Sequence, residues 1–376
     1  MAPKDRELLV VAGEASGDRA AAAVIARLPG TRVFGMGGAA LGAMGAELVS
    51  DLRDLTALGF GETAVRGVNI ARAYFRISRA ARARRPRAAL LVNYTEFNAH
   101  LARRLHAQGT RVLWYGAPQI WAWRADRART LRPSLDRMAV MLPFEEALWR
   151  ENGVDAHYVG HPARETTPLD RDTARRALGM TPFAKAVAIM PGSRPHEVDR
   201  LLGPMLEAYE RVRRDRASLD ARVLLAPSLD AATRTRALAR AEEMRVEVFD
   251  VDAYSGAACV LPAFDAALCA SGTAALEAAL MRAVPVVAYR VGVATEVAAR
   301  LWLRAPHIAL PNVLLGRAAF SELLQRDVRP ATLAKALKQA LDRRRELLAA
   351  CDEVEAALGP LRAPSHEVAR MLEPWL

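Results

Sequence analysis

Two turns in the second half of the chain combine glycine with side chains that suit a diphosphate. Each turn follows a short apolar run and opens a segment with helical periodicity, where the first backbone N–H groups lack intrahelical partners and can meet an anion. Hydroxyls and an arginine add donors, and a glutamate one turn later can accept from ribose hydroxyls. The residues are Gly192, Ser193, Arg194, Ser271, Gly272, Thr273 and Glu277. The pattern predicts a nucleotide-binding second half, and surface turns with capping side chains are the alternative.

Two further glycine-rich turns follow the first and second strand-like runs, over residues 13–18 and 35–38. Neither has the spacing of the dinucleotide fingerprint, and no Gly-Lys-Ser/Thr follows as in a P-loop. On neighbouring strands of one sheet, such turns bring a ligand close to the backbone at the carboxyl edge. We therefore expect a second ligand-binding edge in the first half. Turns in which Ser16 or Asp18 is a simple helix cap are the alternative.

Residues 118–124 place two tryptophans beside Arg124. The rings can form a rigid wall against a sugar or an acyl group, or they can pack as core between elements. The sequence alone leaves both interpretations open.

The segment between Glu62 and Glu96 contains no acidic residue and is rich in arginine. Apolar side chains are interleaved with the arginines, so the segment is predicted to form a basic amphipathic helix that suits anionic lipid headgroups. A solvated helix in an arginine-rich chain is the alternative. A nucleic-acid partner is not expected, because no nucleic-acid-binding module accompanies the charge. The arginines are Arg66, Arg72, Arg76, Arg79, Arg82, Arg84, Arg85 and Arg87.

The composition indicates a cytoplasmic protein with an anionic partner. Of 376 residues, 53 are Lys or Arg and 42 are Asp or Glu, which gives a net charge of +11. The three cysteines have neither metal-ligand spacing nor a partner for each, so we expect small buried thiols in a reducing compartment. No segment approaches the roughly 18 apolar residues of a membrane span, and the first apolar run is too short for a signal peptide. Any membrane contact is therefore expected to be peripheral.

Short apolar runs alternate with longer helix-like stretches along the whole chain, which is typical of βαβ units and parallel sheets. A proline-containing segment at 160–172 separates two such series. We predict two Rossmann-like α/β domains, 1–165 and 173–330, with parallel sheets facing a central cleft. Helices over 331–376 are expected to pack back on the first domain or on a partner chain. The predicted strands are 7–12, 32–35, 88–93, 111–115, 137–142, 156–159, 186–190, 222–226, 245–249, 266–269 and 285–289.

Taken in order, the motifs resemble those of the lipid-A-disaccharide synthase family. They extend over nearly the whole chain, so their joint occurrence is far more specific than any single glycine turn. The matching segments are 11–18 (VAGEASGD), 34–38 (FGMGG), 55–62 (LTALGFGE), 96–98 (EFN), 118–124 (PQIWAWR), 142–145 (LPFE), 159–162 (VGHP), 190–197 (MPGSRPHE), 271–277 (SGTAALE), 310–312 (LPN) and 322–325 (ELLQ).

The resemblance implies a GT-B fold and an inverting glycosyltransferase. Such an enzyme condenses UDP-2,3-diacylglucosamine with 2,3-diacylglucosamine 1-phosphate (lipid X) to the β-1,6-linked lipid A disaccharide 1-phosphate, and UDP leaves. The implied first domain holds the acceptor and faces the membrane, and the second binds the UDP-sugar. A peripheral position on the anionic inner membrane and a homodimer are also implied. No cofactor or metal is expected, because arginine and helix N–H groups can neutralise the diphosphate and no Asp-x-Asp pair is placed to hold an ion.

The resemblance also implies roles for individual residues. For UDP these are Gly192, Ser193, Arg194, Ser271, Gly272, Thr273, Glu277, Asn312, Glu322 and Gln325. For the acceptor side they are Ser16, Asp18, Gly37, Gly38, Trp123, Arg124 and His161. A base must remove the proton from the acceptor 6-hydroxyl, and the candidate catalytic residues are Asn93, Glu96 and Glu14.

The sequence departs from the family at the position of the proposed base. The usual segment reads IDAPDFN, whereas residues 92–98 read VNYTEFN, so that Asn93 replaces the first aspartate and Glu96 the second acid. An asparagine cannot act as a general base at neutral pH, so an active enzyme needs Glu96, Glu14 or His161 in that role. Another UDP-sugar enzyme on the same fold, such as a UDP-N-acetylglucosamine 2-epimerase, is one alternative. An inactive homologue that binds UDP-sugar or lipid is the other.

Overall fold

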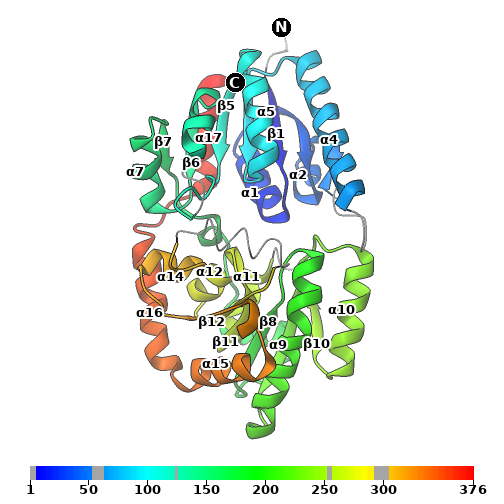
Figure 1. Cartoon of the computed structure of the whole chain (residues 1–376), viewed down its shortest axis with the longest axis vertical. Coiled ribbons are helices and arrows are strands. Elements are labelled where there is room, and N and C mark those ends of the chain that lie inside the picture. Colours follow the sequence, from blue (N-terminus) through cyan, green and yellow to red (C-terminus); the bar gives the residue numbers. More distant parts are fainter. Residues whose placement is uncertain (1–5, 53–62, 123–125, 252–255, 292–304) are drawn as a thin grey trace. The chain divides into compact units, whose positions relative to one another are not determined.

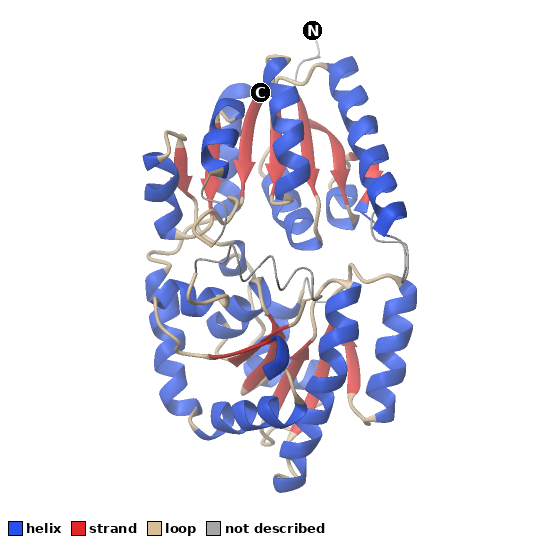
Figure 2. Ribbon diagram, viewed as in Figure 1, coloured by secondary structure: helices blue, strands red, loops and turns tan. Residues whose placement is uncertain are grey.

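The computed structural model describes residues 6–52, 63–122, 126–251, 256–291 and 305–376 (Figure 1). The chain forms two compact units. Unit 1 comprises residues 1–165 and 361–376, and unit 2 comprises residues 166–360. Each unit is a parallel sheet with helices packed on it (Figure 2).

Unit 1 is built on a sheet of seven parallel strands in the order β3-β2-β1-β4-β5-β6-β7. The central strands are continuous apolar runs that are buried along almost their whole length, as expected for a parallel sheet covered on both faces. The strands are β1 Glu7–Ala12, β2 Arg32–Gly37, β3 Glu47–Asp51, β4 Ala88–Val92, β5 Arg111–Tyr115, β6 Arg137–Val140 and β7 Ala156–Tyr158.

Helices cover both faces of the unit 1 sheet. They are α1 Ala15–Ile25, α2 Ala39–Ala43, α4 Thr63–Arg84, α5 Thr95–Ala107, α6 Arg127–Leu131, α7 Pro143–Glu151 and α17 Pro364–Leu372, with short 3-10 turns at Arg132–Ser134, Pro162–Arg164 and Glu373–Trp375. Successive residues of β1 point to opposite faces. Leu8 and Val10 pack with α1 and α17, whereas Leu9 and Val11 pack with α4, α5 and α7.

Unit 2 is built on a sheet of six parallel strands in the order β10-β9-β8-β11-β12-β13. The strands are β8 Ala186–Met190, β9 Asp220–Leu225, β10 Glu247–Asp250, β11 Ala266–Ala270, β12 Val284–Tyr289 and β13 Ser321–Leu324. The helices are α8 Arg171–Ala177, α9 Pro195–Asp215, α10 Ala231–Glu243, α11 Ala257–Val260, α12 Thr273–Leu280, α14 Leu310–Leu315, α15 Pro330–Asp342 and α16 Arg344–Ala357, with 3-10 turns at Leu261–Ala263 and Gln325–Asp327. One core cluster joins β8, β11 and β12 to α8, α11 and α12.

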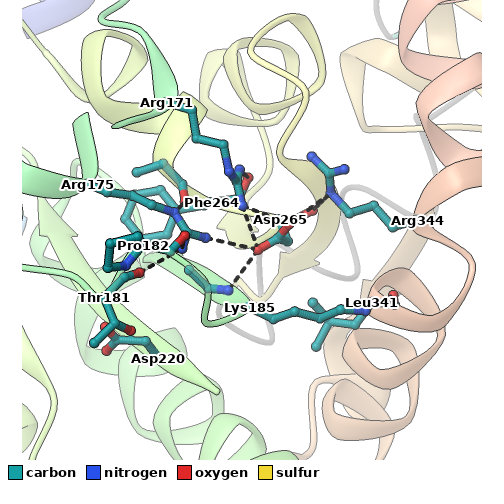
Figure 3. Close-up of polar contacts among 12 residues, drawn as sticks. Arg171, Arg175, Thr181, Pro182, Lys185, Asp220, Phe264, Asp265, Leu341 and Arg344 are labelled. Carbon is teal, nitrogen blue, oxygen red and sulfur yellow. Dashed lines mark hydrogen bonds and ion pairs between the residues drawn. The ribbon is translucent and has the colours of Figure 1, made fainter. Parts of the chain in front are cut away.

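The carboxylate of Asp265 contacts several elements at the amino-terminal edge of the unit 2 sheet (Figure 3). Asp265 directly precedes β11, and it accepts hydrogen bonds from Arg171 at 3.0 and 3.1 Å and from the Ala186 N–H at 2.9 Å. Arg175 and Arg344 lie 3.4 and 3.3 Å from it. The cluster therefore connects α8 and α16 to the starts of β8 and β11, at the edge opposite the turns singled out by the sequence.

The C-terminal helices divide between the units. Helices α15 and α16 belong to unit 2, and α15 packs against α9. Only residues 361–376 return to unit 1, where Val368 and Leu372 of α17 enter the core beside α1. The expectation that residues 331–376 pack back on the first domain or on a partner chain therefore differs from the contacts of α15 and α16, which belong to unit 2.

The sequence analysis missed two strands, β3 and β13. Both are edge strands whose residues are mostly half-buried or exposed, so they lack the continuous apolar run that marks the central strands. Cys269 and Cys351 are buried as predicted, whereas Cys259 is only half-buried. Within the described residues, no helix is both long and apolar enough to cross a membrane.

Candidate functional site

In unit 1 the strand order reverses between β1 and β4. From β1 the chain proceeds through β2 to the edge at β3, and from β4 it proceeds to the other edge at β7. Ligands of such sheets bind at the carboxyl ends of the two strands where the order reverses. The register pairs Ala12 with Val92, the last residues of these strands. The turn 13–18 and the segment 93–98 therefore leave the sheet side by side.

The two segments are in direct contact. A Cβ at Gly13 would lie 2.1 Å from Cγ of Tyr94, and a Cβ at Gly17 would lie 3.3 Å from Val92 Cγ1 and 3.7 Å from Asn93 Nδ2. The ring of Tyr94 thus occupies the space that any larger residue at position 13 would need. Sequence reasoning did not single out Tyr94, because nothing in its spacing marks it.

Asn93 and Tyr94 both have left-handed backbone conformations, with φ of 49° and 43°. Asparagine tolerates this region better than most residues, and two such residues in a row are unusual. The buried Asn98 supports the turn, because its Nδ2 donates to the Asn93 carbonyl at 2.9 Å. A Cβ at Gly116, after β5, would lie 2.0 Å from Asn93 Oδ1. Asn93 is therefore fixed between the ends of β4 and β5, and it presents a neutral amide there.

The candidate bases differ in their surroundings. The side chain of Glu96, in the first turn of α5, is 72% exposed and forms an ion pair with Arg127 of α6, a partner that sequence reasoning missed. Glu14 is half-buried and directly precedes α1. His161 is buried, which lowers the pKa of its imidazole to about 4, and its Nδ1 accepts from the Ala163 N–H at 3.1 Å. The acceptor nitrogen of His161 is thus occupied within the protein.

The carboxylate of Asp18 accepts hydrogen bonds from backbone N–H groups of the protein. It accepts from the N–H groups of Gly38 at 2.7 Å, Ala40 at 3.0 Å and Leu41 at 3.3 Å, at the start of α2. Added Cβ atoms at Gly37 and Gly38 would lie 2.9 and 2.8 Å from its oxygens. Asp18 and these glycines therefore hold the second glycine-rich turn in place. Ser16, the other residue of this turn that was predicted for the acceptor side, is half-buried and lies in the first turn of α1.

The tryptophan-rich stretch is only partly described. Trp123 and Arg124 lie outside the described residues, as does the motif at 55–62. Trp121 is half-buried, and its Nε1 donates to Glu145 Oε1 at 3.1 Å. Glu145 is 2% exposed, and burial raises the pKa of its carboxyl to about 7. The LPFE motif includes Glu145, but its spacing gives no sign of this contact.

In unit 2 the strand order reverses between β8 and β11, and the register pairs Met190 with Cys269. The turns 191–194 and 271–273 therefore emerge side by side at the carboxyl edge, as in unit 1. These are the two turns whose composition predicted a diphosphate ligand.

The first of these turns is held by Glu197, in the first turn of α9. Its buried carboxylate accepts from the N–H groups of Ser193 at 3.0 Å and Arg194 at 3.2 Å, and Arg194 Nη1 lies 3.3 Å from it. Gly192 has a φ of +119°, and a Cβ there would lie 2.4 Å from Glu197 Oε2. The backbone of the turn is thus fixed, while Ser193 and Arg194 are exposed. The spacing of a capping box, three residues after Arg194, is the signal that could have identified Glu197.

The second turn opens α12. The Ser271 N–H donates to the Ala288 carbonyl at 3.2 Å, and its Oγ donates to the Ile308 carbonyl at 3.2 Å. Gly272 has a φ of +134° with no atom within 4 Å of an added Cβ, so its backbone conformation rather than crowding favours glycine. Thr273 and Glu277 are half-buried on the same helix, one turn apart.

Asn312, Glu322 and Gln325 form the scaffold behind this edge. The fully buried Asn312 donates to Phe320 O and Glu322 Oε1, and it accepts from the Ala319 and Phe320 N–H groups, at 2.7 to 3.0 Å. Glu322 also accepts from the N–H groups of residues 308 and 309, and Gln325 Oε1 accepts from the N–H of residue 291 at 3.0 Å. The Asn312 amide therefore has its hydrogen-bonding groups occupied within the protein, which differs from the direct UDP contact that the resemblance implies.

Comparison with known proteins gives the family. A family model described as lipid-A-disaccharide synthetase matches residues 8–371. A lipid-A-disaccharide synthase of Anaeromyxobacter dehalogenans is 41% identical over 366 residues, which cover 95% of this chain and 94% of the relative. That of Myxococcus xanthus is 41% identical over 375 residues and 97% of each chain.

Solved structures confirm the fold class. A UDP-GlcNAc 2-epimerase from Neisseria meningitidis bound to UDP-GlcNAc aligns with a TM-score of 0.63 and 11% identity, covering 98% of both chains. MurG from Acinetobacter baumannii aligns with a TM-score of 0.55 and 14% identity, covering 98% of this chain and 99% of that one. At these identities the likeness shows the GT-B fold alone. The sequence matches extend over nearly the whole chain, and the protein therefore belongs to the lipid-A-disaccharide synthase family of glycosyltransferases.

Proposed function

We propose that this chain transfers 2,3-diacylglucosamine from UDP to the 6-hydroxyl of lipid X, with inversion at the anomeric carbon. The observation that carries the proposal is that the family motifs lie at both strand-order reversals, one in each unit. An epimerase needs no acceptor site, so a second motif-bearing edge in unit 1 supports a transferase.

Unit 2 is the proposed UDP-binding unit. Arg194 is exposed beside a turn whose N–H groups are fixed, and α12 begins at the neighbouring strand with Thr273 in its first turn. A guanidinium and a helix N-terminus can together neutralise a diphosphate. Glu277 is the proposed acceptor for the ribose hydroxyls. The buried residues Asn312 and Glu322 would act by holding this edge in shape rather than by touching UDP.

Unit 1 is the proposed acceptor unit, and Glu96 is the proposed base. Its carboxylate is exposed in the first turn of α5, just after the carboxyl end of β4, and it forms an ion pair with Arg127. Glu96 would take the proton from the acceptor 6-hydroxyl while UDP departs, and Glu14 is the second candidate. Asn93 would orient the hydroxyl as a hydrogen-bonding group, because its amide cannot take the proton.

Helix α4 is the proposed contact with an anionic inner-membrane surface on the cytoplasmic side. Val68 and Phe75 are 47% and 68% exposed. Arg72, Arg76 and Arg79 are exposed at helical spacing beside them, so apolar and basic groups share one face. Arg84 is not part of this face, because it pairs with residues 7 and 47 of unit 1. The side chain of Arg66 lies outside the described residues.

The membrane contact can be tested by flotation with vesicles. Phe75→Ser and Arg76→Glu should each reduce binding to anionic vesicles, by about 1 kcal/mol for the arginine, and neutral vesicles should bind weakly. Arg27→Glu, at an exposed arginine in the turn that follows α1, is the matched control. Equal losses from Arg76→Glu and Arg27→Glu would reject α4 as the contact. A homodimer is part of the proposal on the resemblance alone, and sedimentation velocity tests it.

The reaction is tested by mass spectrometry of products formed from UDP-2,3-diacylglucosamine with and without lipid X. The tetraacyl disaccharide 1-phosphate should appear only when both substrates are present. Conversion of the UDP-sugar without acceptor would instead support an epimerase. UDP binding with no turnover under either condition would support an inactive homologue.

A further inference from the structure

Glu145 is a buried carboxylate that the proposed reaction does not use. It is 2% exposed and lies in the first turn of α7, where its Oε2 accepts from the Leu142 N–H at 3.1 Å. Its Oε1 accepts from Trp121 Nε1 at 3.1 Å. One carboxylate therefore caps its own helix and binds a side chain that lies 24 residues earlier in the chain.

Trp121 is held from two sides by consecutive residues of α7. Phe144 packs edge-on against its ring, with centroids 5.7 Å apart, and Glu145 binds its N–H. The neighbours of Trp121 in the chain, Ile120 and Ala122, are buried, whereas Trp121 itself is half-buried. The backbone is thus anchored on each side and the indole orientation is fixed, which leaves part of the ring open to a ligand.

This tryptophan follows the carboxyl end of β5, the strand next to β4. The first residue after β5 is Gly116, which lies against Asn93 at the proposed acceptor edge. Trp121 therefore belongs to the same edge of unit 1 as the candidate catalytic residues. A fixed aromatic ring there is suited to the apolar face of a sugar or to the first carbons of an acyl chain.

Capping of α7 alone does not account for a carboxylate at this depth. Burial raises the pKa of Glu145 to about 7, so the ionised form is disfavoured by its surroundings. A glutamate at this position of a helix can cap equally well from the surface. The additional partner that the buried position provides is the indole of Trp121.

We propose that Glu145 is a positioning residue for the acceptor glycolipid: it fixes Trp121, whose ring forms one wall of the acceptor site in unit 1. The inference rests on the proposed function, because it takes unit 1 as the acceptor unit. It adds a specificity element, since Trp121 would bind the acceptor and contribute nothing to UDP.

The test is a comparison of KM for lipid X with KM for the UDP-sugar in four proteins. Trp121→Phe keeps a ring and removes the N–H, and Glu145→Gln leaves only one acceptor oxygen for two N–H donors. Each should raise the KM for lipid X by about tenfold with the donor KM unchanged, as expected for the loss of one hydrogen bond. Their combination should be no worse than either alone, because they remove the same contact.

Trp149→Phe is the matched control. Trp149 lies on the same helix and is fully buried, and within the described residues its Nε1 has no hydrogen-bond partner. This variant tests the effect of a smaller ring in the unit 1 core, and it should leave both KM values unchanged. An unchanged lipid X KM in Trp121→Phe and Glu145→Gln, or an equal rise for donor and acceptor, would overturn the proposal.

Direct binding of lipid X, measured by titration calorimetry, separates this inference from the proposed reaction. If the wild-type protein binds lipid X but forms no product, the reaction proposal fails. The role of Glu145 is then decided by the Kd for lipid X, which Trp121→Phe and Glu145→Gln should each raise about tenfold over the wild type. If the wild-type protein does not bind lipid X, both proposals fail.

Discussion

The two strand-order reversals are built in different ways. In the two turns that follow β8 and β11 of unit 2, the residues with positive φ are glycines, Gly192 and Gly272, and buried polar residues such as Asn312 support the edge. In unit 1 the turn that follows β4 has its positive φ angles at Asn93 and Tyr94, which are not glycines, and Tyr94 lies against Gly13 of the neighbouring turn.

This difference follows the chemistry proposed for each edge. The proposed diphosphate partners in unit 2 are the exposed side chains of the turn at Ser193 and Arg194 and the N-terminus of α12. Unit 2 therefore needs a fixed backbone, which Glu197 and Gly192 provide. A single proton acceptor can be supplied by a residue at another position, provided that the turn keeps its backbone conformation. Unit 1 keeps the turn through Asn98 and Gly116 while Asn93 replaces the family's carboxylate.

The largest expected effect on stability comes from Gly13→Ala. The new methyl group would collide with the Tyr94 ring, so the free energy of unfolding in urea should fall by about 3 kcal/mol. Gly272→Ala in unit 2 meets no neighbouring atom and should lose only the cost of its backbone conformation, about 1 kcal/mol.

Tyr94→Gly costs stability by itself, because its ring packs against Phe97, but combined with Gly13→Ala the total loss should be smaller than the sum of the two single losses, since the collision is relieved. Combined with Gly272→Ala, it should give the full sum of the single losses. If Gly13→Ala is no more damaging than Gly272→Ala, the close contact between the two turns of unit 1 is wrong.

Arg194→Ala tests the proposed UDP-binding edge of unit 2. Loss of a charged donor to the diphosphate should weaken UDP binding about thirtyfold, or about 2 kcal/mol, in titration calorimetry. Arg211→Ala, an exposed arginine on the same helix, should leave the Kd unchanged. A similar loss in both variants would mean that general positive charge, and not Arg194, attracts UDP.

The pH dependence of stability provides a smaller and more specific signature of unit 1. Glu145 has its folded-state pKa raised from 4.5 to about 7, so its contribution is present at low pH and is lost as pH rises to 7. His161 has its pKa lowered from 6.5 to about 4, so its contribution is present near neutrality and is lost as pH falls. Between pH 4.5 and 6.5 the two oppose each other.

Substitution of either residue should therefore leave the pH dependence of stability that the other residue causes. Relative to the wild type, the free energy of unfolding of Glu145→Gln should rise with pH over this window, and that of His161→Gln should fall. Each slope should be about 1.4 kcal/mol per pH unit at most. Urea unfolding at several pH values measures both, and parallel curves for all three proteins would contradict the assigned burial of these groups.

Much of the fold could be predicted from the sequence, because the central strands are continuous apolar runs. The predicted bounds of β5 and β8 agree with the structure, and the turns at 13–18, 191–194 and 271–273 follow the carboxyl ends of strands as expected. The turn predicted at 35–38 is wrong in part, because β2 continues to Gly37 and only Gly38 follows it. The edge strands β3 and β13 could not be predicted in this way, because they are only partly buried and lack such a run.

The site was less predictable, because its supporting contacts join residues far apart in the chain. Asp18 binds N–H groups that lie 20 to 23 residues later, and Glu145 binds Trp121. Such contacts leave no spacing pattern, so the sequence identified the motif residues without distinguishing those that support an edge from those that face a ligand. Asn312 and Asp18 are the clearest cases.

The central claim is that unit 1 keeps its catalytic edge with Glu96 in place of the lost aspartate, while unit 2 binds UDP independently of that change. It is tested most directly by kcat for disaccharide formation and Kd for UDP in the wild type, Glu96→Gln and Asn93→Asp. We predict equal Kd values, a wild-type kcat that Glu96→Gln lowers about a thousandfold, and an active Asn93→Asp. An active Glu96→Gln, or activity in Asn93→Asp alone, would contradict the account.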